Sequence, residues 1–448
     1  MPPSPEAGAH QPDKVQAQRM RQTARDIFLH ALREASIEKA FRRHVHLDRS
    51  VLRIGEDLYD VSGERRVFAV AIGKAAYTMM DCLHAQLGTR LTGIAVGATE
   101  PAEHRLGVQY FRGGHPVPNA ESWRAAEAVL RSLKQQGPAA LVIFLLSGGG
   151  SALLEKPISE DISLDDLMAA YQALVLSGAT IVEINAIRKH LSAVKGGRLA
   201  QAAAPAQQVS ILVSDVPDNA PDALASGPTM PDSSTVKDCY RVAEQYGLLP
   251  QLPELVRRLF AERRLEETPK AGDEAFGRSR WWTVLSNAEV RQAAAGAAAR
   301  AGFAVTIDNS CDDRDYAAAA AHLLGRLREM RQGVSRVCLI SGGEVTVRVQ
   351  NGGRGGRNQQ FALYCAQKIA GESITILSAG TDGIDGNSPA TGAVADGTTL
   401  ERARAKGLDA AAALAKFDAF PFFEALGDAI VTGPTGNNLR DLRVLLGY

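Results

Sequence analysis

The stretch VFAVAIGKAAYTMMDCLHAQL, residues 67–87, decides the fold class. An apolar run rich in valine and alanine ends at Gly73, and a helical pattern of apolar residues begins directly after it. Three later runs continue the theme: LTGIAVGA (91–98), LVIFLLSGGGS (141–151) and QQVSILVSDV (207–216). Buried strands that alternate with helices predict an α/β fold with a parallel sheet covered by helices on both faces.

A second alternating set follows a charged segment that contains several prolines. Its predicted strands are WWTVLSN (281–287), FAVTIDN (303–309), RVCLISGGEVTVRV (336–349) and SITILSAGTDG (373–383). We therefore expect two α/β domains, at 19–250 and 281–448, joined by a connecting segment at 251–280. The polar, proline-rich residues 1–18 are expected to form a disordered tail, and apolar residues at helical spacing from about Val15 to Ala35 predict an opening helix.

Composition excludes several classes of protein. Among 448 residues, 50 Lys and Arg balance 50 Asp and Glu, which argues against nucleic-acid binding through bulk charge. The five cysteines form no CxxC pair, which argues against a zinc site or a disulfide framework and favours reduced thiols in the cytoplasm. No run of about 18 apolar residues predicts a membrane span.

Glycines, a lysine and acidic residues stand where the predicted strands end. In open parallel sheets, ligands bind beyond the carboxyl ends of the strands, and backbone N–H groups of a glycine turn can hold phosphate oxygens. Taken alone, each of these residues could instead have a purely structural role, in a tight turn, as a cap or as a solvated charge. The residues concerned are Lys74, the turn Ser147, Gly148, Gly149, Gly150 and Ser151, then Asp215, Gly342, Gly343, Glu344 and Asp382.

Together these residue types suit phosphoryl transfer. The donor needs amides and cations around its phosphates, Mg²⁺ needs carboxylates, and the transition state needs an arginine or lysine. A Walker motif, the protein-kinase HRD and DFG motifs, a GxGxxG fingerprint and a GxSxG elbow are all absent. The absence of the dinucleotide-binding GxGxxG motif argues against a nicotinamide-dependent dehydrogenase. His115 in GGHPVP is expected to be a structural, hydrogen-bonded histidine.

The segment NGGRGGRNQQ, residues 351–360, connects a predicted strand to a predicted helix. Val345, Val347 and Val349 alternate before it, and QQFALYCAQKIA follows with helical spacing. A turn at this place is therefore favoured over an RNA-binding RGG tract. Arg357 at the helix start is expected to reach the phosphates, and Asn358 either positions a phosphate or caps the turn.

Many motifs, taken in order, resemble those of the bacterial glycerate 2-kinases with a C-terminal MOFRL domain, which are often labelled hydroxypyruvate reductases. The resemblance implies ATP-dependent phosphorylation of D-glycerate at its 2-hydroxyl with Mg²⁺ or another divalent cation. It also implies a larger Rossmann-like N-terminal domain, a smaller C-terminal α/β domain and an active site in the cleft between them. The motifs include AIGKAA (71–76), GGHPVPNAES (113–122), LLSGGGSALLEKP (145–157), INAIRKHLSAVKGGRLA (184–200), LVSDVP (212–217), SGGEVTVRV (341–349), GGRGGRNQQFAL (352–363), SAGTDGIDG (378–386) and TGPTGNN (432–438).

The resemblance also implies roles for individual residues. Lys74 and Arg357 match the family's active-site lysine and arginine, Asp215 matches the acid of its SDV motif, and the SGGGS turn matches its phosphate or substrate loop. From their place on a predicted helix and at its end, Arg188 and Lys195 are second candidates for the substrate carboxylate, with a solvated helix face as the alternative. The expected nucleotide ligands include Gly342, Gly343 and Asn358, and the expected metal ligands are Asp215, Glu344 and Asp382. The chain departs from the family at Asn219, Gln360 and Asn437, which bears on metal and substrate more than on fold.

Two alternatives stay open: an NAD(P)H-dependent hydroxypyruvate reductase, and a non-catalytic nucleotide-binding relative. The expected partners are D-glycerate and ATP, with no nucleic acid and no membrane, and a homodimer is left open.

Overall fold

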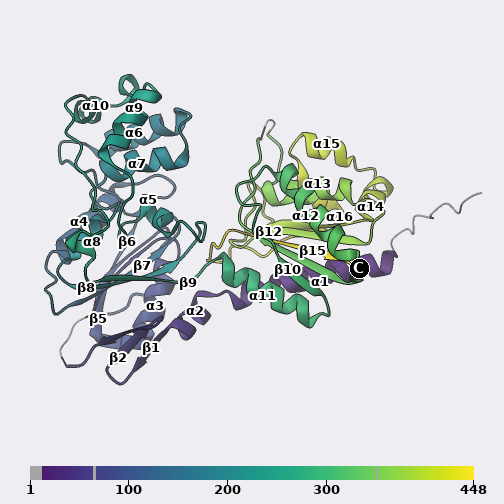
Figure 1. Ribbon diagram of the computed structural model, residues 1–448, viewed down its shortest axis with the longest axis horizontal. Helices are drawn as coiled ribbons and strands as arrows, with labels where there is room; N and C mark the ends of the chain where they lie inside the picture. The colour runs from purple at the N-terminus through teal and green to yellow at the C-terminus, as the bar shows by residue number, and fades with distance from the viewer. Residues whose placement is uncertain (1–12, 64–66, 350–351) are drawn as a thin grey trace, which may run out of the picture. The chain divides into compact units, whose positions relative to one another are not determined.

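The computed structural model describes residues 13–63, 67–349 and 352–448, which fold into two compact units (Figure 1). One unit is Ile37–Val284, and the other combines the residues up to Ser36 with Leu285–Tyr448. The expected boundaries differ from these units at the N-terminus. Helix α1 (Lys14–Glu34) begins inside the expected tail and packs against α11 (Asn287–Arg300) and β12 (Ile374–Gly380) of the second unit. Its buried stripe, which includes Met20 and Phe28, packs against elements that begin at Asn287 or later, and local sequence cannot specify these partners. Residues 1–12 of the expected tail lie outside the described residues.

The unit Ile37–Val284 is built on a six-stranded sheet in the order β6-β5-β4-β7-β8-β9. Strands β4 to β8 pair in parallel, as the apolar runs predict, and β9 lies at the edge beside β8. The chain runs outward from β4 in one direction and then from β7 in the other, so the switch in strand order falls between β4 and β7. The strands are β4 (Val67–Ile72), β5 (Leu91–Gly97), β6 (Val108–Arg112), β7 (Leu141–Ser147), β8 (Gln207–Val213) and β9 (Ser279–Leu285).

Helices cover both faces of this sheet. Side chains of α4 and α8 share one core with Phe68, Val70 and Ile72, whereas α3 packs on β4, β5 and β7 from the other face. A three-stranded antiparallel sheet precedes β4. The elements are α2 (Ile37–His44), β1 (Val45–Asp48), β2 (Val51–Ile54), β3 (Asp57–Asp60), α3 (Ala76–Leu87), η1 (Gly88–Arg90), α4 (Ala120–Leu133), α5 (Gly150–Leu153), α8 (Arg198–Ala203), η2 (Pro221–Ser226) and η4 (Glu274–Phe276).

Two sequence-based expectations are wrong around the supposed connecting segment. The WWTVL run was expected to open the second domain, but it forms β9 of the first sheet, and Trp282 Nε1 donates to Asp57 Oδ2 at 2.8 Å. Residues 251–280 are not a linker, because α10 and Leu265 are part of a helical core. Helix α10 is amphipathic, because exposed Arg257 and Arg258 lie beside buried Val256 and Phe260. Other charges of the segment follow the helix, and two of them, Glu267 and Lys270, pair at 2.8 Å.

Four helices form a separate cluster at one end of this unit, above the sheet in Figure 1. They are α6 (Leu164–Leu176), α7 (Ile181–Leu191), α9 (Val236–Gln245) and α10 (Glu254–Ala261), with η3 (Leu249–Gln251) before α10. Ser163, Thr180 and Thr235 begin three of them with reciprocal capping boxes, which satisfy the first backbone N–H groups. The cluster packs Leu167, Ile187 and Val242 together.

The second unit contains a mixed sheet in the order β10-β11-β15-β12-β13-β14. Only β10 and β11 pair in parallel, and the other pairs are antiparallel. Helices α1 and α11 pack together on the sheet, and α12 and α13 share a different core with β11, β12 and β15. The elements are α11 (Asn287–Arg300), β10 (Ala304–Ile307), α12 (Tyr316–Arg331), β11 (Val337–Gly342), α13 (Arg357–Lys368), β12 (Ile374–Gly380), β13 (Gly392–Asp396), α14 (Thr399–Ala405), α15 (Ala410–Ala415), α16 (Ala419–Leu426), β14 (Ala429–Ile430) and β15 (Asp441–Gly447).

The alternating valines at 345–349 do not form the predicted strand. Strand β11 ends at Gly342, and beyond it Thr346 makes only an isolated bridge with Asp315. The helix predicted after the glycine segment does form, and it begins at Arg357. Across the described ranges, no helix is both long and apolar enough to span a membrane.

Candidate functional site

The turns after β4 and β7 are joined at the switch point of the first sheet. The Lys74 N–H donates to the Gly148 carbonyl at 2.9 Å, and the Ala75 N–H donates to Ser147 Oγ at 3.0 Å. Gly73 adopts φ +128°, and a Cβ there would lie 2.2 Å from Ser147 Oγ, so only glycine fits between the two turns. The backbone is thus fixed on both sides of Lys74, whose side chain is exposed.

Three strand ends converge around the glycine turn. Gly149 is left-handed at φ +81°, and a Cβ there would lie 3.0 Å from His115 Cδ2 and 3.2 Å from Lys74 Cγ. A Cβ on Gly148 would lie 1.9 Å from Asp215 Oδ2, so the carboxylate that follows β8 lies against this turn. Lys74, the glycine turn and Asp215 therefore lie together, as expected for residues at the carboxyl ends of neighbouring parallel strands.

His115, expected to have a structural role, also belongs to this group. Burial and the positive charge of the neighbouring Lys74 lower the pKa of His115, so its imidazole is held toward the neutral form. The GGHPVP motif marked the position, but nothing local shows that the loop folds onto the glycine turn.

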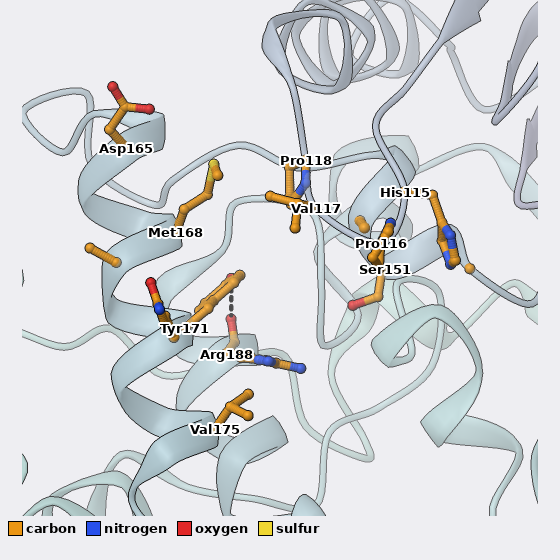
Figure 2. A pocket seen from close by; sticks show the side chains of 14 residues that line it. His115, Pro116, Val117, Pro118, Ser151, Asp165, Met168, Tyr171, Val175 and Arg188 are labelled. Atoms are coloured by element: carbon orange, nitrogen blue, oxygen red, sulfur yellow. Dashed lines mark hydrogen bonds between the residues drawn. The ribbon is translucent and has the colours of Figure 1, made fainter. Parts of the chain in front are cut away.

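A cavity of about 760 Å³ opens beside the turn (Figure 2). His115, Gly149 and Ser151 line one end, with the Arg188 guanidinium pointing toward it. The other end is formed by the 116–118 loop and by α6, and its lining is mainly apolar, although α6 also contributes Asp165 and Gln172. The apolar lining residues include Val117, Pro118, Met168 and Val175. The cavity thus pairs a cationic, hydrogen-bonding end with an apolar end.

Arg188 extends from α7 into the cavity. Its guanidinium lies over the Tyr171 ring at 5.0 Å, and its buried Nε has no hydrogen-bond partner. The Tyr171 hydroxyl contacts the Arg188 carbonyl at 3.4 Å, the dashed line in Figure 2. A buried guanidinium N–H without an acceptor is costly, and a bound carboxylate or phosphate would satisfy it.

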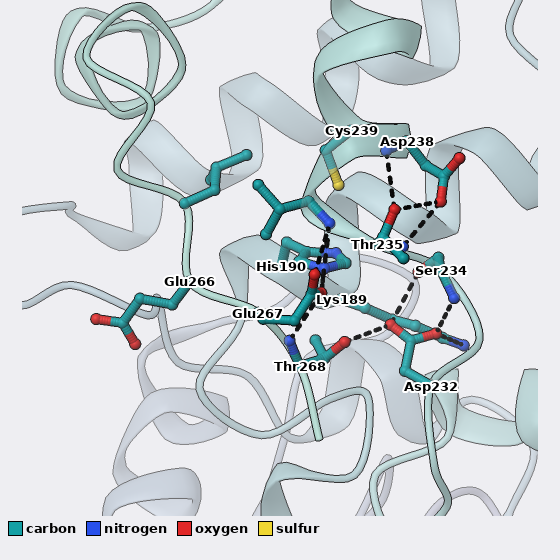
Figure 3. Close-up of polar contacts among 12 residues, drawn as sticks. Lys189, His190, Asp232, Ser234, Thr235, Asp238, Cys239, Glu266, Glu267 and Thr268 are labelled. Atoms are coloured by element: carbon teal, nitrogen blue, oxygen red, sulfur yellow. Dashed lines mark hydrogen bonds and ion pairs between the residues drawn. The ribbon is translucent and has the colours of Figure 1, made fainter. Parts of the chain in front are cut away.

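The end of α7 that carries Arg188 is held by a polar network (Figure 3). Lys189 pairs with Asp232 at 3.1 Å, His190 Nε2 contacts Glu267 Oε1 at 2.8 Å, and Thr268 Oγ1 donates to Asp232 at 2.8 Å. Burial raises the pKa of Glu267, but hydrogen bonds led by those from Lys270 and His190 outweigh it and lower that pKa to about 2. The network fixes the helix end, and with it the position of Arg188.

Lys195, expected to bind the substrate carboxylate, is instead buried and does not line the cavity. Its side chain is 1% exposed and pairs with Glu155, which is fully buried. Tyr171 and Ser192 also donate to the Glu155 carboxylate, at 2.9 and 2.6 Å. Burial lowers the pKa of Lys195, although the charge of Glu155 opposes this. A buried carboxylate needs such a partner, so the lysine has a structural role.

In the second unit, Arg357 is held by two carboxylates. Its Nε and Nη2 donate to the Asp441 carboxylate at 2.6 and 3.0 Å, and Nη2 lies 2.8 Å from Glu344 Oε1. Glu344, expected to bind metal, is thus paired with an arginine. Burial raises the pKa of Glu344 even though Arg357 opposes the shift. No sequence motif marks Asp441, which begins the last strand, β15.

The three expected metal ligands divide between the units. Asp215 belongs to Ile37–Val284, whereas Glu344 and Asp382 belong to the other unit. The Asp382 carboxylate accepts the Ile384 N–H at 3.1 Å and lies beside Gly380, as does Asp441. Over the part of the chain that is described, no group of three His, Cys, Asp or Glu side chains is arranged to hold a metal.

The remaining residues expected to bind nucleotide have structural contacts. The carbonyls of Gly342 and Gly343 accept hydrogen bonds from buried Arg443 at 3.1 and 3.0 Å. Asn358 is 1% exposed, accepts from Ser378 Oγ at 2.6 Å and contacts Asp385 at 3.4 Å, so its amide faces the interior rather than a phosphate. Burial raises the pKa of Asp385 to about 6.

Two of the three family departures make structural hydrogen bonds. The Gln360 amide donates to the Leu414 carbonyl and the Asn437 amide to the Ala35 carbonyl, both at 2.9 Å. Asn219 is exposed. The first two therefore join elements within the second unit.

Comparison with known proteins gives a consistent result. Residues 23–261 match the model of a domain of unknown function, DUF4147, and residues 337–441 match the MOFRL family. A Thermotoga maritima protein named D-glycerate 2-kinase is 36% identical over 84% of this chain and 89% of its own. An Agrobacterium vitis protein provisionally named a hydroxypyruvate reductase is 39% identical over 85% of this chain and 87% of its own. The crystal structure of a Thermotoga maritima glycerate kinase superposes with a TM-score of 0.84 at 32% identity, over 96% of this chain and 100% of that one.

Proposed function

Because this chain belongs to the glycerate kinase family that combines a DUF4147 domain with a MOFRL domain, we propose that it transfers the γ-phosphoryl group of ATP to the 2-hydroxyl of D-glycerate. The products are 2-phospho-D-glycerate and ADP. One observation carries the proposal beyond the family: Lys74, the glycine turn and Asp215 meet at the switch point of a parallel sheet, beside a cavity that Arg188 enters. Nucleotides bind at such switch points.

In this proposal, the cations supply most of the catalysis. Lys74 neutralises the transferred phosphoryl group, and the N–H groups of the glycine turn donate to phosphate oxygens. Arg188 binds the glycerate carboxylate, because its guanidinium has a buried N–H without an acceptor. Asp215 orients the 2-hydroxyl for attack or holds the metal.

The donor set fits Mg²⁺ that arrives with ATP. Mg²⁺ is commonly bound by one or two carboxylates together with substrate phosphates, rather than by an all-protein cage. Asp215 offers one carboxylate beside Gly148, which matches that requirement. When bound, the metal would neutralise charge on the phosphates.

We also propose that Arg357 contributes positive charge to turnover. Its side chain is 34% exposed, and its double hydrogen bond to Asp441 orients the guanidinium. An arginine fixed in this way loses little conformational freedom when it meets an anion.

The direct test is ADP release with Mg-ATP and D-glycerate, with the product identified by ³¹P NMR. We expect 2-phosphoglycerate at roughly 1–100 turnovers per second. Formation of 3-phosphoglycerate would show that the assignment of the 2-hydroxyl as acceptor is wrong. The absence of ADP release at these rates would favour a non-catalytic relative.

The reductase name of the Agrobacterium vitis relative supports a second candidate. A hydroxypyruvate reductase would oxidise NADH when hydroxypyruvate is added. Robust NADH oxidation with hydroxypyruvate, together with no ADP release in the glycerate assay, would contradict the kinase proposal.

A further inference from the structure

The apolar end of the cavity has no role in the proposed handling of D-glycerate. Glycerate has three carbons and a polar group on each, and it would fill a small part of a cavity of about 760 Å³. Val117 and Val175 line this end and remain 51% and 58% exposed. Met168 extends from α6 toward Val117 and Pro118 of the facing loop (Figure 2). An exposed apolar surface that continues into a hydrogen-bonding end is typical of a small-molecule site.

We propose that this apolar end binds the purine base of the phosphoryl donor, between Met168 on one side and Val117 and Pro118 on the other. The inference rests on the proposed function, since it assigns the nucleoside part of the same reaction. Three observations carry it. The apolar end and the glycine turn line one continuous cavity, the cavity lies at the switch point, and its volume falls in the range that holds ligands of nucleoside size.

The alternative occupant is an apolar side chain on a larger 2-hydroxy acid. That acid would place its carboxylate on Arg188 and its side chain against Met168. If the purine base occupies the apolar end, changes to Met168 weaken nucleotide binding. If the acid's side chain occupies it, they weaken acceptor binding. Variants of Met168 therefore distinguish the two occupants.

The experiment uses the full chain with Met168→Ala, which removes wall contacts, and Met168→Trp, which fills the apolar end. Leu176→Trp is the matched control, because Leu176 lies on the same helix, is 75% exposed and does not line the cavity. Titration calorimetry measures the Kd of ADP and of inorganic tripolyphosphate, which carries phosphates without a base. Steady-state assays measure KM for ATP and for D-glycerate.

We expect Met168→Ala to raise the Kd of ADP roughly tenfold, and Met168→Trp to raise it further. Tripolyphosphate binding and KM for D-glycerate stay unchanged, and Leu176→Trp behaves as wild type. Val117→Ala, from the opposite wall, gives the same pattern should Met168→Trp fold poorly.

Other results would overturn the inference. A rise in KM for D-glycerate with unchanged Kd for ADP assigns the apolar end to the acceptor, and a parallel loss of tripolyphosphate binding means that the wall acts through the glycine turn. If neither the Kd of ADP nor the KM for D-glycerate changes, the apolar end does not bind the purine base. The kinase proposal then still stands if turnover is normal. Conversely, if the wild type binds ADP, Met168→Trp does not, and glycerate is not phosphorylated, the base site holds and the proposed acceptor is wrong.

Discussion

Replacing Lys195 by Met tests whether this lysine stabilises the fold or binds substrate. The substitution keeps much of the side-chain volume but leaves the fully buried Glu155 carboxylate without its cation. Removing one partner of a buried pair typically costs about 3–5 kcal/mol. For a unit of this size, at about 2–4 °C per kcal/mol, the Tm of the unit Ile37–Val284 should fall by roughly 6–20 °C.

Urea unfolding followed by circular dichroism, together with scanning calorimetry, measures this loss. Replacing both partners, as in Lys195→Met with Glu155→Leu, removes the unpaired charge, so most of the lost stability should return. Arg188→Ala is the contrasting variant: it should raise KM for D-glycerate and leave Tm close to wild type. A Lys195→Met protein with wild-type Tm and a raised KM for D-glycerate would refute this reasoning and restore Lys195 as a substrate ligand.

Three further predictions concern the other charged groups. Lys74→Ala should lower kcat by about 10³-fold or more with unchanged circular dichroism, and a near-native kcat/KM would remove Lys74 from the mechanism. Arg357→Ala should cost about 1–3 kcal/mol in urea unfolding, because buried Asp441 loses its donor, and should also lower kcat; a variant that loses stability but keeps kcat would make Arg357 purely structural. Glu267 has a folded-state pKa of about 2, below the ordinary 4.5, so its carboxylate stabilises the fold above pH 4.5 and loses that contribution as pH falls toward 2. Glu267→Gln should therefore show a shallower loss of stability over this range, and an unchanged acid-unfolding curve would contradict the assigned contacts.

Much of the fold could be predicted because its signals are local. The apolar runs that end in glycine are strands β4, β5 and β7, and Lys74, Ser147–Ser151 and Asp215 follow strands that the structure places side by side. The prediction of the domain boundary was wrong because one sequence pattern suits a strand in either domain. The WWTVL run is a strand in either domain, and only its hydrogen bonds with the first sheet decide which one it joins.

By itself, the sequence of this protein determined the main strands of the first sheet and which of their ends carry cations, acids and glycines. The tertiary structure alone decided which charged side chains are paired with one another. Lys195 pairs with Glu155, which is 40 residues away in the sequence, and Arg357 pairs with Asp441, which is 84 residues away. Secondary structure follows from side-chain periodicity over a few residues, whereas the partner of a buried charge is set by long-range packing, because a charge removed from water must be paired wherever the fold provides an opposite charge.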